Sequence, residues 1–178
     1  HQHEYSVAWI DCLAKDTQTG RGVFIVGDHA RYGSLEVDER AKLSMPLTPP
    51  VSLINNLSLR AFNDMYWRVH PAQSTRKRGN YEPFFYPLDR ILHWNRIYGR
   101  RGFQQYQCVI PDAVAEVVMR ELLEAIAESG QGSFLAVLKR CGNIASPGLL
   151  SFPLPGTSLA LDFPQKNDLK PLFARLDA

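Results

Sequence analysis

The chain has 178 residues, of which 45% are hydrophobic and 21% are charged. This composition is typical of a globular domain and excludes the class of disordered chains with low hydropathy and high charge. Twenty basic and eighteen acidic side chains leave a formal net charge of +2. No nucleic-acid partner is predicted, because the densest basic runs, Arg76-Lys77-Arg78 and Arg100-Arg101, lie in loop-like sequence that favours solvated surface.

The cysteine pattern indicates neither a disulfide framework nor a zinc site. Cys12, Cys108 and Cys141 are an odd number without CxxC spacing, which fits a reducing cytoplasm. His1 and His3 are terminal, and we expect no native metal site there. No apolar run approaches the roughly 20 residues that cross a bilayer, so we expect a cytoplasmic chain without a transmembrane segment.

In the first half, the alternating run Tyr5–Asp11 and the β-rich run Gly22–Gly27 predict a β-hairpin. The proline-rich stretch 30–50 predicts a surface excursion. Apolar residues then recur at helical spacing and predict a helix over Val51–Val69, which Pro71 ends. The expected apolar stripe of this helix consists of Leu53, Leu57, Leu59, Ala61, Phe62, Met65 and Tyr66.

The segment 73–98 differs from its surroundings. Residues 73–81 are polar, basic and glycine-containing, and residues 81–98 are rich in aromatic side chains that need a cover. We expect this region to be mobile when no ligand covers it.

The second half alternates strand and helix patterns. It predicts a strand over 103–110, a helix from Pro111 to Ser129 closed by Gly130, a strand over 133–139, a hairpin of 148–153 with 157–163, and a helix over 168–177. The expected apolar face of the first helix consists of Val114, Val117, Val118, Leu122, Ala125 and Ile126. The predicted fold class is α+β: one domain over 1–178, with a largely antiparallel sheet and helices packed on one face in a split βαβ-like order.

Candidate binding residues lie on the predicted strands. Gln105 and Gln107 flank Tyr106, so period-two alternation puts both amides on one face, where they suit sugar hydroxyls. An edge strand with a solvated polar face accounts for the pattern equally well. Lys139 and Asp162 are either isolated charges at strand ends or a buried ion pair. No GxGxxG, P-loop, HExxH or GxSxG motif occurs, so the chain carries no nucleotide cradle of its own.

The chain resembles the C-terminal substrate domain of vanillyl-alcohol-oxidase-type FAD enzymes. The similar blocks, in matching order, are YSVAWID (5–11), GRGVFIVGDHA (20–30), FFYPLDRILHWNRIYG (84–99), GFQQYQCVIP (102–111), FLAVLKRCG (134–142) and LLSFPLPGTSLALDFP (149–164). The resemblance implies an FAD-binding domain in cis, with this domain roofing the flavin. It also implies oxidation of a secondary alcohol (CH–OH) of a sugar, such as the 2′-hydroxyl of a polyprenyl-phosphate ribose, to a ketone.

By that resemblance, six residues line the substrate pocket: Trp9, Leu88, Gln105, Gln107, Lys139 and Asp162. Lys139 and Gln105 would face the flavin. Ala160 departs from the family branch that oxidises ribose, which has a cysteine there. The chain also stops before a lysine-bearing segment of the family, so we expect a fragment that is inactive alone and binds no FAD by itself.

The implied partners are the FAD domain, a sugar or polyprenyl-phosphate sugar, and a reductase or epimerase that acts on the product. Membrane association would be peripheral, through a lipid-linked substrate. A stand-alone α+β interaction module that uses the aromatic segment 84–98 is the alternative. A single-strand nucleic-acid platform built on residues 98–101 is not supported by the net charge.

Overall fold

A five-stranded antiparallel sheet forms the centre of the computed structural model, with strand order β2-β1-β6-β7-β5. The structure describes residues 3–33, 43–70, 74–88, 90–145, 147–149, 151, 154–165 and 169–178. The strands are β1 (Tyr5–Ile10), β2 (Gly22–Gly27), β5 (Phe103–Pro111), β6 (Ala136–Cys141) and β7 (Gly156–Pro164). The predicted α+β class, the antiparallel sheet and the first hairpin are confirmed.

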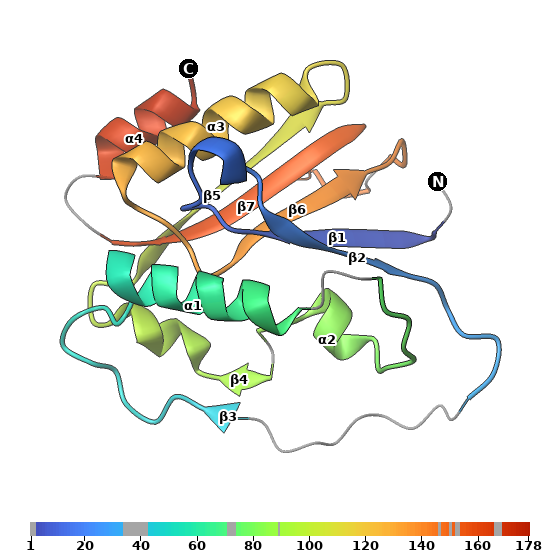
Figure 1. The fold of residues 1–178 in the computed structure, drawn as a ribbon, viewed down its shortest axis with the longest axis horizontal. Helices are drawn as coiled ribbons and strands as arrows, with labels where there is room; N and C mark the ends of the chain where they lie inside the picture. The colour runs from blue at the N-terminus through green and yellow to red at the C-terminus, as the bar shows by residue number, and fades with distance from the viewer. Residues whose placement is uncertain are drawn as a thin grey trace.

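Helices α3 (Ala115–Ser129) and α4 (Leu169–Leu176) cover one face of the sheet (Figure 1). Period two turns Tyr106 toward them, where its ring lies 5.6 Å from that of Phe173 and its hydroxyl donates to the Leu176 carbonyl (2.9 Å). The main hydrophobic core fills this interface. Its members include Ile110, Met119, Leu122, Leu123, Ile126, Leu159, Leu161, Phe163, Leu169, Leu172 and Leu176.

A second layer lies on the opposite side of the sheet (Figure 1). It contains the helices α1 (Asn56–Val69) and α2 (Glu82–Phe85), the short parallel strands β3 (Leu43–Ser44) and β4 (Ile91–Leu92), and a 3₁₀ turn (Trp94–Tyr98). Aromatic contacts join this layer to the sheet: the rings of Trp9 and Tyr66 lie 4.5 Å apart, and those of Tyr98 and Phe103 lie 4.6 Å apart. The sheet is therefore enclosed between two layers, and helices lie on both of its sides.

Helix α1 begins five residues later than predicted, at Asn56. A capping box sets its start: the Asn55 side chain accepts from the Ser58 N–H (3.0 Å), and Ser58 Oγ accepts from the Asn55 N–H (3.0 Å). The predicted stripe is also partly wrong, because Leu57 and Met65 are exposed while Leu59 and Asn63 are buried. Its predicted end at Val69 is confirmed.

Helix α3 begins at Ala115 rather than at Pro111. Pro111 instead ends β5, opposite Gly156, so its missing N–H falls at the end of an edge strand, where it is tolerated. Val114 and Val117 are exposed, and Met119, Leu123 and Ala127 join the predicted Leu122, Ala125 and Ile126 in the buried face. Gly130 closes the helix as predicted, with φ of 66°.

The predicted hairpin around residues 154–156 is wrong for the described residues. Gly148, Leu149, Ser151 and Leu154 form no strand, and the partners of β7 are β6 and β5. Residues 150, 152 and 153 lie outside the described residues. The strand expected over 133–139 begins later, at Ala136, because the Ser133 hydroxyl is bonded to the main chain of Leu135 and closes a local turn. Helix α4 is confirmed over Leu169–Leu176.

The segment 73–98 forms α2, β4 and the 3₁₀ turn over its described residues. Its C-terminal end packs on the sheet: Tyr98 is buried, and the Trp94 ring lies 5.4 Å from that of Phe103. Residues 73 and 89 lie outside the described residues. The mobility of the remainder stays a prediction.

No helix in the described parts of the chain is long and apolar enough to cross a membrane.

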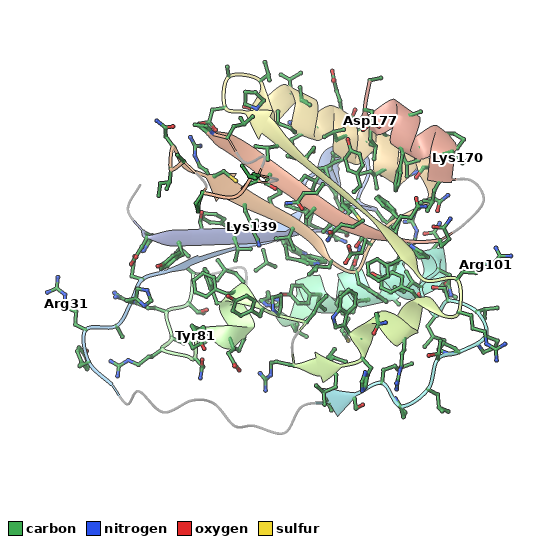
Figure 2. All side chains as sticks on the ribbon, turned by 180° about the vertical axis from the view of Figure 1, so that it is seen from behind. Arg31, Tyr81, Arg101, Lys139, Lys170 and Asp177 are labelled. Atoms are coloured by element: carbon green, nitrogen blue, oxygen red, sulfur yellow. The ribbon has the colours of Figure 1, made fainter. Side chains whose placement is uncertain are left out.

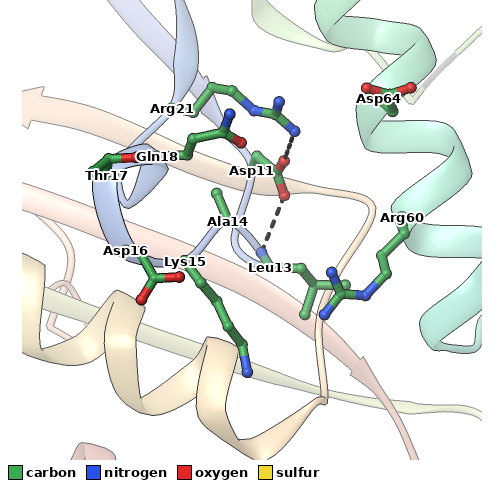
Figure 3. Close-up of a pocket in the computed structure, with 10 residues that line it drawn as sticks. All are labelled: Asp11, Leu13, Ala14, Lys15, Asp16, Thr17, Gln18, Arg21, Arg60 and Asp64. Carbon is green, nitrogen blue, oxygen red and sulfur yellow. Dashed lines mark hydrogen bonds and ion pairs between the residues drawn. The ribbon is translucent and has the colours of Figure 1, made fainter.

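A buried ion pair at the end of β1 lies where the sheet meets the second layer (Figure 3). Asp11 is 4% exposed, pairs with Arg21, and accepts from the Leu13 N–H (3.1 Å) and from Asn63 Nδ2 (2.6 Å) on α1. Arg21 also lies over the Trp67 ring, 5.5 Å from its centroid. One carboxylate thus joins β1, the loop that follows it and α1.

We expect Asp11→Ala to lower the free energy of unfolding by about 3–5 kcal/mol, because it leaves the guanidinium of Arg21 without its partner in a mostly buried place. The matched control is Asp112→Ala, which breaks an exposed pair with Arg140 and should cost less than about 1 kcal/mol. Urea denaturation measures both values. Equal losses for the two variants would contradict the assignment of Asp11 as an anchor.

Candidate functional site

Five of the six predicted site residues lie on one face of the sheet. The register places Gln105 opposite Asp162 and Gln107 opposite Ala160, and Ala160 in turn lies opposite Val137. Val137 pairs with Trp9, and Lys139 pairs with both Ser158 and Val7. Because directly paired residues and alternate residues share a face, these side chains form one surface, opposite the core. We call Gln105, Gln107, Lys139, Ser158 and Asp162 the polar face.

The polar face is turned toward the second layer. Trp9 and Phe103 share its side of the sheet and contact Tyr66 and Tyr98 of that layer. Figure 2 shows Lys139 at the level of the sheet, with Tyr81 in the layer beneath it. The polar face therefore lies on the side of the sheet that carries the second layer.

The two glutamines are placed as their spacing predicts. Both are exposed on β5, and Tyr106 between them points into the opposite, packed side. Gln107 Nε2 donates to Ser158 Oγ over a long distance of 3.5 Å. The alternative interpretation of these glutamines was an edge strand with a solvated polar face. Strand β5 is indeed an edge strand of the sheet, but its two amides lie beside polar groups of β7 as well as solvent.

Asp162 is a buried carboxyl on the polar face. It is 2% exposed, and its Oδ1 has no hydrogen-bond partner. Burial raises the pKa of the Asp162 carboxyl, and the hydrogen bond from the Gln105 side chain partly offsets this effect. A buried carboxyl oxygen without a partner is costly, and Asp162 Oδ1 is therefore our candidate acceptor for a ligand donor.

Lys139 and Asp162 do not form the ion pair that the sequence left open. Lys139 pairs with Ser158, four residues from Asp162 along β7, a separation of roughly 13 Å at the usual rise of a strand. Lys139 is exposed and forms no salt bridge within the described residues. Its ammonium group is free to contact a ligand.

Trp9 and Leu88 stand apart from the polar groups. Trp9 is 8% exposed, is covered by Tyr66, and donates from Nε1 to the Phe134 carbonyl (3.4 Å). It forms the apolar border of the polar face. Leu88 comes from the second layer, in the turn before β4, where it is half-buried and its carbonyl accepts from Ile91 (2.9 Å).

Sequence reasoning missed Ser158. Its side chain is buried beside Gln107, and its main chain is opposite Lys139. The period-two run Ser158, Ala160, Asp162 carried the signal, since these residues share one face of any strand. Ala160 lies between Ser158 and Asp162 on the same face.

A hollow of about 570 Å³ lies elsewhere, between the loop after β1 and α1 (Figure 3). Its charged lining is largely internally paired: Asp11 with Arg21, Asp64 with Arg68, and Arg60 with Asn56. Each place has a buried group without a partner, Arg21 Nε at the hollow and Asp162 Oδ1 at the polar face. We place the candidate site at the polar face, because there the unpartnered oxygen shares one face with four other polar side chains. Cys12 beside the hollow is no nucleophile, since burial raises the pKa of its thiol to about 12.

The chain is similar to decaprenylphosphoryl-beta-D-ribose oxidase of Mycolicibacterium smegmatis (strain ATCC 700084 / mc(2)155). The two are 32% identical over an alignment of 184 positions, which covers 98% of the chain and 39% of that protein. It is also similar to an uncharacterized protein in the mprA 5′ region of Streptomyces coelicolor, with 30% identity over 93% of the chain and 48% of the relative. No protein-family model matches the chain. The resemblance seen in the sequence blocks is confirmed, and the chain spans less than half the length of these relatives.

The raised pKa of Asp162 predicts a pH-dependent effect of Asp162→Asn. The pKa of the Asp162 carboxyl is higher in the folded state than its ordinary value of 3.8. Its contribution to stability is therefore fully present only below pH 3.8, and it is lost as the pH rises through the folded pKa. We therefore expect Asp162→Asn to be more stable than the wild type at pH 7, with the difference disappearing below pH 3.8.

Asp28→Asn is the control with the opposite sign. The Glu4 N–H and then His3 lower the pKa of Asp28, so its contribution is present at pH 7 and lost in acid. Thermal unfolding of the three proteins between pH 3 and pH 7 tests both signs. An Asp162→Asn variant that is less stable at pH 7 would contradict the assignment.

Proposed function

We propose that this chain is the substrate-side domain of an FAD-dependent oxidoreductase that oxidises a secondary alcohol of a sugar. The observation that carries the proposal is the polar face, where amides, a hydroxyl, an ammonium group and a buried carboxyl with a free oxygen share one side of the sheet. Sugars present several hydroxyls, each both donor and acceptor, which match such a mixed set.

Each group has a distinct role in this proposal. Lys139 donates charge-assisted hydrogen bonds to a substrate oxygen and stabilises the negative charge that develops when the alcohol loses its proton. Gln105 and Gln107 orient neighbouring hydroxyls through their amides. Asp162 Oδ1, which has no partner, accepts from a substrate O–H.

Bound FAD would supply the acceptor for the hydride from the sugar C–H. The described residues fit the side of the flavin rather than its phosphates: Lys139 and Gln105 lie on the open polar face, and the chain has no glycine-rich phosphate cradle. We propose that an FAD-binding domain in cis holds the cofactor, and that this chain alone is inactive.

The substrate class that we favour is a polyprenyl-phosphate ribose, oxidised from the 2′-hydroxyl to the ketone. The support is the relative from M. smegmatis, whose name gives decaprenylphosphoryl-β-D-ribose as its substrate. A lipid-linked substrate would bring a cytoplasmic enzyme to the membrane periphery. A reductase that returns hydride to the opposite face of the ketone would complete an epimerisation and is the partner we propose.

The alternative of a stand-alone interaction module has less support. It requires the aromatic segment 84–98 as a partner surface, but Tyr98 and Trp94 pack against Phe103 of the same chain. Phe85 and Tyr86 remain exposed.

The test uses the full-length protein that contains this chain. We expect it to purify with bound flavin and to reduce a redox dye when given polyprenylphosphoryl ribose with a short prenyl chain. Lys139→Met should lower kcat/KM by about 100-fold, the usual effect of removing one donor to a developing oxyanion.

Lys170→Met is the matched control, since Lys170 lies on α4, beyond the opposite face of the sheet (Figure 2). It should leave kcat/KM unchanged. A colourless full-length protein, or equal losses in the two lysine variants, would overturn the proposed function.

A further inference from the structure

Asp162 lies one residue beyond the last β7 residue that pairs with β6. Strand β6 begins at Ala136, whose partner is Leu161, so β6 offers no strand residue beside Asp162. On the other side β5 continues, with Gln105 opposite Asp162. In an antiparallel sheet the N–H and the C=O of one residue point toward the same neighbour, so both main-chain groups of Asp162 need substitute partners if they face the missing strand.

Ser133 provides the first substitute. Its hydroxyl oxygen accepts from the Asp162 N–H (3.0 Å) and from the Leu135 N–H (3.1 Å), and it donates to the Leu135 carbonyl (2.8 Å). Ser133 is 1% exposed, and its own N–H donates to Cys12 Sγ (3.4 Å). This hydroxyl therefore replaces the main chain of β6 at the point where the strand is absent.

Tyr98 provides the second substitute, from the other layer. Its hydroxyl donates to the Asp162 carbonyl at 3.4 Å, a long hydrogen bond, in a place where the Tyr98 side chain is 2% exposed. Burial, and then the nearby charge of Asp162, raise the pKa of the Tyr98 phenol, so it stays protonated and remains a donor. The rings of Trp94 and Phe103 fix its position.

We propose that Ser133 and Tyr98 are positioning residues of the site, which hold the Asp162 main chain in strand geometry beyond the end of β6. They thereby keep its carboxyl at the polar face with one oxygen free for a substrate hydroxyl. The role in substrate binding rests on the proposed function, whereas the positioning itself does not. Neither residue touches the substrate in this arrangement, and both act through Asp162.

The physical reason for two anchors is the unpartnered Oδ1. The free energy of a buried carboxyl with an unpartnered oxygen falls when the carboxyl turns toward water or toward another donor. Strand pairing on the β5 side alone leaves the end of β7 free to move in that direction. Bonds to both the N–H and the C=O of Asp162 remove this freedom without occupying the side chain.

The test is a titration of the Asp162 carboxyl by ¹³C NMR, in this chain labelled at the aspartate side-chain carboxyl carbon. The signal is identified by its loss in Asp162→Asn. Among the described residues, the Gln105 side chain is the polar group that acts on this carboxyl, and the Tyr98 phenol is the titratable group close to it, bonded to the main-chain carbonyl of Asp162. We expect its midpoint in the wild type to lie above the ordinary value of 3.8.

In Tyr98→Phe and in Ser133→Ala we expect the midpoint to fall toward the ordinary value by at least about half a pH unit, because water reaches a carboxyl that is no longer held. Tyr106→Phe is the matched control: it removes a tyrosine hydroxyl that donates to the Leu176 carbonyl on the opposite face, and it should leave the midpoint unchanged. A merely structural role would lower the melting temperature without moving this midpoint.

An unchanged midpoint in Tyr98→Phe, or an equal fall in Tyr106→Phe, overturns the proposal. Ser133 also bonds Leu135 and Cys12, so if Ser133→Ala does not fold, Tyr98→Phe decides. The titration needs no flavin and no substrate. If the midpoints move as expected but the full-length protein is colourless, the positioning stands and the proposed function fails.

Discussion

The pairing of β7 with strands on both of its sides is the constraint on which the core and the site both depend. All nine residues of β7 are buried or half-buried, and their side chains alternate between an apolar and a polar side. Leu159, Leu161 and Phe163 form part of the core beneath α3 and α4, while Ser158, Ala160 and Asp162 belong to the other face. A slip of one residue would exchange these two sets. The hydrophobic effect that fixes the core therefore also fixes the position of the polar groups.

The sequence predicts the local part of this arrangement well. Period two alone places the amides of Gln105 and Gln107 on one face and Tyr106 on the other, because alternation is a property of any strand. It cannot predict that Gln105 faces Asp162, since that pair joins strands more than fifty residues apart and depends on the register. The same limit explains why an ion pair between Lys139 and Asp162 remained open: only the pairing of Lys139 with Ser158 separates them.

The incorrect predictions share a physical cause: in each case, contacts with residues distant in the sequence determined the structure of the segment. The run 148–153 has strand composition, but its described residues Gly148, Leu149 and Ser151 form no strand, and β7 pairs with β5 and β6 instead. On α1 the apolar pattern favoured a stripe through Leu57 and Met65, yet the helix buries Asn63, which donates to Asp11 (2.6 Å). A polar residue on a buried face gives no signal in a hydrophobic pattern, so its partner had to be known first.

Two buried carboxylates show how a structural anchor differs from a site in this fold. Asp11 is 4% exposed and Asp162 is 2% exposed, so desolvation is severe for both. Asp11 receives a guanidinium, an amide and a main-chain N–H, which occupy both of its oxygens. Around Asp162 the fold instead satisfies the main chain, whose N–H donates to Ser133 Oγ and whose carbonyl accepts from the Tyr98 hydroxyl, and it leaves Oδ1 without a partner. An unsatisfied buried oxygen costs free energy, and side-chain oxygens of Asn63 and Gln131 also lack partners. Asp162 differs from these in sharing a face with Gln105, Gln107 and Lys139, and for that reason we propose that a ligand supplies its missing donor.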